Sequence, residues 1–132
     1  MAKDSRGGKR GSGGGNTSYR NTEDYKDAYA DEIRLRQSEA PVPGALPSQS
    51  QDDDTVETQM RGYASAIGDP IKAMENYRDS IKREYYNNEY DKAQSDYDKG
   101  YGEAMVEMMG QYDQAIDRMK KIKKNSKRPD LL

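Results

Sequence analysis

The residue types that could carry chemistry in this 132-residue chain are limited, because it contains no His and no Cys. Without them there is no Ser-His-Asp or Cys-His nucleophile system, no imidazole proton shuttle and no conventional zinc site. The densest acidic run, Asp52 to Asp54, lacks the spaced oxygen ligands and the internal Gly of a calcium loop. Neither GSGGGN at 11–16 nor GGKR at 7–10 completes a nucleotide-binding loop. We therefore expect no enzyme, no metal and no cofactor.

Tyrosine is the only aromatic residue type, and five of the eleven tyrosines fall within YYNNEYDKAQSDYDKGY at 85–101. From Tyr86 to Ile122 the apolar residues recur every 3.6 positions on average, which predicts one face of one straight helix running through Gly100 and Gly102. Such a face is either a helix-packing seam or a recognition surface, since Tyr buries much area with little loss of side-chain entropy. The candidate partner-binding residues are Tyr86, Tyr90, Tyr97, Tyr101, Met108 and Tyr112.

Charge is distributed unevenly along the chain. Residues 1–20 carry five Lys or Arg and one Asp, residues 21–117 carry ten against twenty-two acidic residues, and residues 118–132 carry seven against one. The net charges are +4, −12 and +6, so the acidic middle suits a basic partner and the basic ends suit phosphates. The candidate electrostatic contacts are Lys120, Lys121, Lys123 and Lys124.

The elements that must position these residues are helices. Only 32% of the residues are hydrophobic against 35% charged, which argues against a large core and favours helices laid together or docked on a partner. We predict an all-α chain divided into a disordered Gly-rich basic arm at 1–20, a short amphipathic helix at 21–39, a Pro/Gly/Asp linker at 40–54, a helical interaction region at 55–124 and a basic tail at 125–132.

Within the interaction region the pattern predicts a short helix ended by Gly68 and a new helix begun by Asp69 and Pro70. A first apolar stripe from Ile71 to Tyr85 is out of phase with the second by roughly 140° on ideal helix geometry. Two models follow: a helical hairpin that turns near Asn87, or one long, coiled-coil-like helix from 70 to 124. The turn-favouring Asn87-Asn88 pair inclines us to the hairpin.

These features predict a non-catalytic protein-protein interaction protein, such as an assembly factor, scaffold or adaptor, that also self-associates. One alternative is an inhibitor whose acidic, Tyr-rich surface blocks a nucleic-acid-binding enzyme, and another is nucleic-acid binding by the basic termini. The absence of any long apolar run argues against a membrane span and for an intracellular, cytoplasmic location. The layout of basic arm, acidic helical middle and basic tail is similar to that of small viral scaffolding and assembly factors, which implies virion association.

Overall fold

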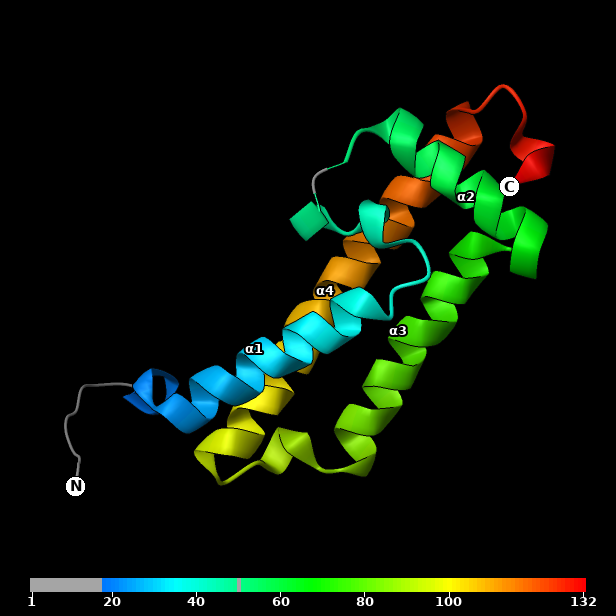
Figure 1. The fold of residues 1–132 in the computed structure, drawn as a ribbon. Coiled ribbons are helices and arrows are strands. Elements are labelled where there is room, and N and C mark those ends of the chain that lie inside the picture. The colour runs from blue at the N-terminus through cyan, green and yellow to red at the C-terminus, as the bar shows by residue number, and fades with distance from the viewer. Residues whose placement is uncertain (1–17, 50) are drawn as a thin grey trace.

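The computed structural model describes residues 18–49 and 51–132, with the backbone alone at Ile67. These residues form four α-helices joined by short 3₁₀ segments and contain no strand, so the all-α prediction is confirmed (Figure 1). The helices are α1 (Glu23–Ser38), α2 (Asp53–Ile67), α3 (Pro70–Asn87) and α4 (Asp96–Asn125). Most of the predicted disordered arm lies outside the described residues, and its last residues belong to a 3₁₀ helix, Ser18–Asn21.

Each α-helix begins at a side chain that accepts a hydrogen bond from the first turn. Thr22, Asp52, Asp69 and Ser95 are the N-caps of α1, α2, α3 and α4 respectively. Pro70 follows Asp69 at the first helical position, as the sequence predicts. Gly68 ends α2 with a φ of 103°, a conformation that disfavours any side chain.

The hairpin is confirmed and the single long helix is excluded, because α3 and α4 pack side by side as an antiparallel pair (Figure 1). Between them, Asn88 closes α3, Glu89 takes a left-handed φ of 55°, and Tyr90–Lys92 forms a 3₁₀ turn. The prediction that the tyrosines of 86–101 share one face of one helix is therefore wrong. Tyr86 lies in the last turn of α3 and Tyr97 in the first turn of α4, and the 3.6-residue spacing between them crosses residues that are not α-helical.

The longest helix, α4, packs against both α1 and α3. It runs through Gly100 and Gly102 without a break, as predicted. At Gly100 the backbone of α1 comes so close that an added Cβ would stand 2.6 Å from the Tyr25 carbonyl oxygen. The helix buries ten residues, among them Met105, Met108 and Met119, against the apolar sides of its neighbours.

Residues 40–49, predicted as a linker, pack into the core instead of spanning open solvent. Val42, Ala45 and Leu46 are 0–1% exposed and join Val56 and Met60 of α2 in the same apolar cluster. The prolines favour two 3₁₀ turns, Pro43–Ala45 and Pro47–Gln49. The apolar side chains of this segment follow neither the helical nor the strand spacing, so the sequence pattern did not predict that they would be buried. Leu132, the last residue of the sequence, is also buried in this apolar cluster.

One buried ion pair stabilises the junction of α1 and α3. Arg36 of α1 is 4% exposed and binds Glu32 of the same helix, Glu84 Oε2 at 2.8 Å and the Tyr77 hydroxyl at 3.3 Å. Burial alone would lower the pKa of Arg36, but the hydrogen bonds that its guanidinium donates to Glu32, Glu84 and Tyr77 outweigh burial and raise that pKa. Arg36 is therefore permanently charged, and the paired carboxylates are what make its burial possible.

Candidate protein-interaction surface

Five tyrosine rings meet where the α3-α4 hairpin turns, and we call them the tyrosine cluster: Tyr85, Tyr86, Tyr90, Tyr97 and Tyr101. The centroid of Tyr85 lies 5.0 Å from that of Tyr86 and 6.5 Å from that of Tyr90. Tyr90 in turn lies 6.4 Å from Tyr101, which lies 4.9 Å from Tyr97. The rings come from the end of α3, the 3₁₀ turn and the start of α4, so the turn itself assembles the cluster.

The two ends of this chain of rings face solvent. Tyr86 is 55% exposed and Tyr97 is 45% exposed, whereas Tyr85, Tyr90 and Tyr101 are half-buried beneath them. The hydroxyls of Tyr97 and Tyr101 lie 3.0 Å apart, and this hydrogen bond together with burial raises the pKa of Tyr101 to about 12. The cluster is therefore an aromatic surface in which two exposed rings adjoin three half-buried ones.

The structure brings together four of the six predicted partner-binding residues and separates the other two from them. Met108 and Tyr112 are fully buried, and the Tyr112 hydroxyl donates a hydrogen bond of 2.9 Å to the Arg36 carbonyl oxygen. The Tyr112 ring also lies 5.5 Å from that of Tyr77. The C-terminal part of the predicted stripe is thus a packing seam within the chain, and its N-terminal part is the uncovered surface.

Carboxylates surround the tyrosine cluster. Asp91, Asp96 and Asp98 lie in or beside the hairpin turn with no cation within ion-pair distance among the described residues, while Glu89 lies 3.8 Å from Lys92. Asp91 also lines a small pocket together with Tyr85, Tyr90, Glu103 and the cation Lys99. This end of the molecule therefore combines aromatic area with negative charge, which is complementary to a cationic surface.

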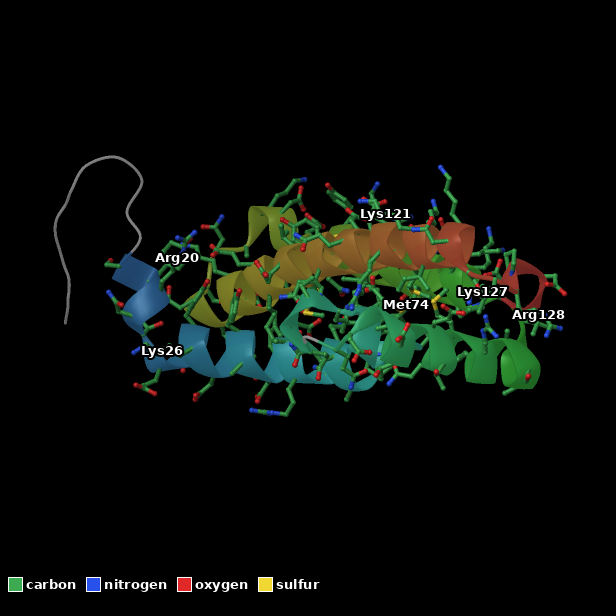
Figure 2. The ribbon with its side chains drawn as sticks, turned by 90° about the horizontal axis from the view of Figure 1, so that it is seen from above. Arg20, Lys26, Met74, Lys121, Lys127 and Arg128 are labelled. Atoms are coloured by element: carbon green, nitrogen blue, oxygen red, sulfur yellow. The ribbon has the colours of Figure 1, made fainter. Side chains whose placement is uncertain are left out.

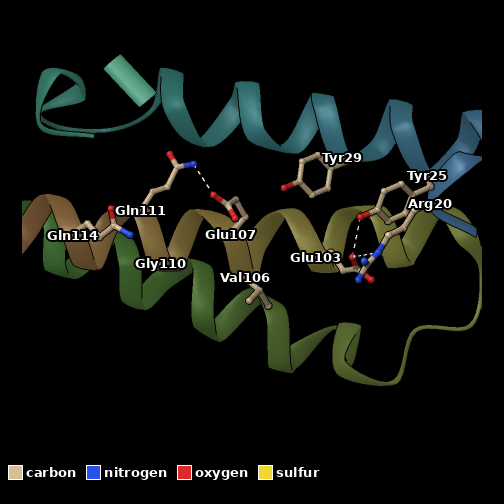
Figure 3. Close-up of a pocket in the computed structure, with 9 residues that line it drawn as sticks. All are labelled: Arg20, Tyr25, Tyr29, Glu103, Val106, Glu107, Gly110, Gln111 and Gln114. Atoms are coloured by element: carbon tan, nitrogen blue, oxygen red, sulfur yellow. Dashed lines mark hydrogen bonds and ion pairs between the residues drawn. The ribbon is translucent and has the colours of Figure 1, made fainter. Parts of the chain in front are cut away.

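A second group of tyrosines, which the sequence reasoning did not place in a site, lines a groove between α1 and α4 (Figure 3). The Tyr25 hydroxyl donates to Glu103 Oε1 at 2.8 Å, Arg20 Nε donates to the same oxygen at 3.1 Å, and the Tyr19 hydroxyl also binds Glu103. Burial would raise the pKa of Glu103, but the bonds from Tyr19 and Tyr25 and the charge of Arg20 outweigh it and lower that pKa. The i+4 spacing of Tyr25 and Tyr29 indicates that these two tyrosines share one helix face. Glu103 lies too far along the chain for any local sequence pattern to pair it with them.

The four predicted lysines lie at the opposite end of the molecule from the tyrosine cluster. Lys120 is paired with Glu75 at 3.5 Å, whereas Lys121, Lys123 and Lys124 have no ion-pair partner among the described residues. Lys120, Lys123 and Lys124 line one shallow pocket beside Pro129, and Lys121 lines another. Figure 2 shows Lys121 on the outer side of α4, and Lys127 and Arg128 just beyond the end of that helix.

The described part of the chain contains no cluster of residues that could bind a metal ion. No group of three or more Asp or Glu side chains is placed to hold a metal ion there. Within the same residues, no helix combines the length and the apolar character that crossing a bilayer requires. Comparison of the chain with protein-family models, with curated proteins and with solved structures finds no match.

Proposed function

We propose that this chain is a non-catalytic helical interaction protein, an assembly factor or adaptor, that binds a protein partner through the tyrosine cluster. The observation that carries the proposal is the exposure of Tyr86 and Tyr97 at the two ends of one chain of five touching rings. An exposed aromatic surface of this kind is typical of interface hot spots, because Tyr gives large contact area and a hydroxyl while losing little entropy.

The chemistry around the cluster favours a partner with a basic surface. Asp91, Asp96 and Asp98, which have no ion-pair partner among the described residues, would repel a phosphate backbone and attract Lys and Arg. Packing on Tyr86 and Tyr97 would then supply contact area, with cation-π contacts to arginines at the rim. An inhibitor of a nucleic-acid-binding protein is the special case in which that basic surface is the nucleic-acid groove.

The test uses the double substitution Tyr86→Ala/Tyr97→Ala and a matched control, Leu35→Ala/Leu131→Ala, since Leu35 and Leu131 are each 43% exposed elsewhere on the surface. Proteins bound to the immobilised full chain are compared by quantitative mass spectrometry among the wild type and the two variants. We expect at least about a tenfold loss of specific partners for the tyrosine variant alone, as for a hot-spot pair. Equal partner recovery from all three proteins would refute the proposal.

Nucleic-acid binding by the basic end is a second candidate, favoured by the absence of ion-pair partners for Lys121, Lys123 and Lys124 among the described residues. Substitution of Lys120, Lys121, Lys123 and Lys124 by Gln should then abolish binding to a fluorescent duplex, and wild-type affinity should fall steeply with salt. Affinity that is independent of both salt and these lysines would eliminate this candidate.

A further inference from the structure

A separate surface, on α4 rather than at the hairpin turn, remains uncovered along the middle of the helix. We call it the outer stripe, and it consists of Val106, Glu107, Gly110, Gln114, Asp117 and Lys121. All six residues are exposed, and Val106 is 50% exposed. Their spacing of three or four residues places them on one side of the helix. The core and the tyrosine cluster use other sides of α4, and four residues of the outer stripe, Val106, Glu107, Gly110 and Gln114, also line the groove beside α1.

The glycine in this stripe has no explanation within one chain. A Cβ at Gly100 would strike α1, and a Cβ at Gly102 would lie 3.1 Å from Tyr90, so both of those glycines permit close packing. A Cβ at Gly110 would meet nothing within 4 Å. A glycine in the middle of a long helix costs stability. Gly110 therefore leaves open space beside α4, as Gly62 does beside α2, and in the outer stripe that space is available to a second chain.

Charge decides what could occupy this face. From residue 100 to residue 117 α4 carries four carboxylates and no Lys or Arg, whereas Lys121 and Lys124 follow with no ion-pair partner among the described residues. Glu107 accepts a hydrogen bond only from the Gln111 side chain at 2.9 Å, again within the described part of the chain. The exposed side of α4 is thus negative in its first part and positive in its last part. Two antiparallel copies of this helix would therefore place opposite charges next to each other.

The register follows from the spacing. Glu107 and Lys121 lie seven residues on either side of Gln114, about two helical turns each, so all three share a face. Antiparallel pairing centred on Gln114 places Glu107 of each copy opposite Lys121 of the other. Pairing centred on Gly110 would instead place Glu107 opposite Asp113, and parallel pairing would align like charges along both helices.

From this arrangement we propose that the outer stripe binds a second copy of this chain, with the two α4 helices antiparallel across a two-fold axis beside Gln114. In this register Gly110 faces Arg118 of the other copy and leaves room for that side chain, and Val106 loses its exposure to water. The contact is isologous and closes as a dimer rather than growing into a fibre. It is independent of the tyrosine cluster, which remains free for a different partner.

The charge arrangement is tested by sedimentation equilibrium of the full chain at low salt. Because two-fold symmetry makes each substitution act twice, Glu107→Lys should weaken the dimer by about tenfold or more. Lys121→Glu should do the same, and the double variant Glu107→Lys/Lys121→Glu should restore dimerisation because the pair is only exchanged. A wild type that is monomeric at every concentration, or a double variant as weak as the single ones, overturns the proposal.

Two further measurements distinguish the loss of this dimer from misfolding of the chain, and this interface from dimerisation through the tyrosine cluster. Gly110→Leu should block the dimer yet leave the helical monomer intact, whereas Gly62→Leu, at the equally open Gly62 of α2, should leave the dimer unchanged. Since the chain has no Cys, Gln114→Cys should form a disulfide-linked dimer on oxidation and Lys82→Cys on α3 should not. A dimer that survives Gly110→Leu but is lost with Tyr86→Ala/Tyr97→Ala would overturn this interface.

Discussion

The same substitution at two glycines of one helix should have opposite effects on stability. Gly100→Ala places a Cβ 2.6 Å from the Tyr25 carbonyl oxygen and 3.0 Å from the Ala28 Cβ, both fixed in α1. To regain an ordinary contact of 3.4 Å, α1 must retreat by about 0.8 Å along its closest approach to α4. Gly110→Ala adds the same methyl group in open space.

The magnitudes follow from two terms. Alanine is favoured over glycine in a helix interior by about 1 kcal/mol, so Gly110→Ala should raise the free energy of unfolding by up to that amount. At Gly100 the same gain is set against overpacking, which typically costs about 1–3 kcal/mol. We expect Gly100→Ala to lower the free energy of unfolding by up to about 2 kcal/mol, so the two variants should differ by roughly 1–3 kcal/mol.

The assay is urea denaturation followed by circular dichroism, at a protein concentration low enough for the chain to be monomeric, with thermal melts as a second readout. The expected difference corresponds to about 4–12 °C in melting temperature for a chain of this size. If Gly100→Ala stabilises the protein as much as Gly110→Ala, then α1 does not lie against Gly100, and the α1-α4 packing described above is incorrect.

Three further predictions concern buried polar groups. Arg36→Met should lower the free energy of unfolding, measured by urea denaturation, by about 3–5 kcal/mol, because it leaves the buried Glu32 without a cation. The double variant Arg36→Met/Glu32→Met should lower it by less, because no unpaired charge is then buried. Tyr112→Phe removes the hydroxyl that donates to the Arg36 carbonyl and should cost about 1 kcal/mol in the same assay, while an unchanged midpoint would contradict that buried bond. Because the pKa of Glu103 is lower in the folded protein than its ordinary value of 4.5, its contribution to stability is present above that pH and is lost as pH falls through the folded pKa. Glu103→Gln should therefore flatten the acid limb of a stability-against-pH curve, and an unchanged limb would mean that Tyr19, Tyr25 and Arg20 do not favour the ionised carboxylate.

Local signals in the sequence were sufficient for the individual helices. Asp69-Pro70 identifies the start of α3 and Gly68 the end of α2, because capping and left-handed backbone depend on adjacent residues alone. The helical spacing from Tyr101 to Ile122 correctly identifies one buried face of α4. The same periodicity failed between Tyr86 and Tyr97, because spacing alone cannot detect a turn in which Glu89 adopts a left-handed conformation.

The sequence by itself determined the class of the protein: helical, rich in tyrosine, acidic in the middle and basic at both ends, without the residues for His- or Cys-based chemistry. Only the tertiary structure decided which tyrosines are surface and which are core. Tyr97 and Tyr112 lie only about 60° apart around α4 on ideal helix geometry, yet Tyr112 is fully buried beside α1 whereas Tyr97 is 45% exposed. Coverage depends on contacts between residues far apart in the chain, such as Tyr112 with Arg36, and these contacts leave no local pattern in the sequence.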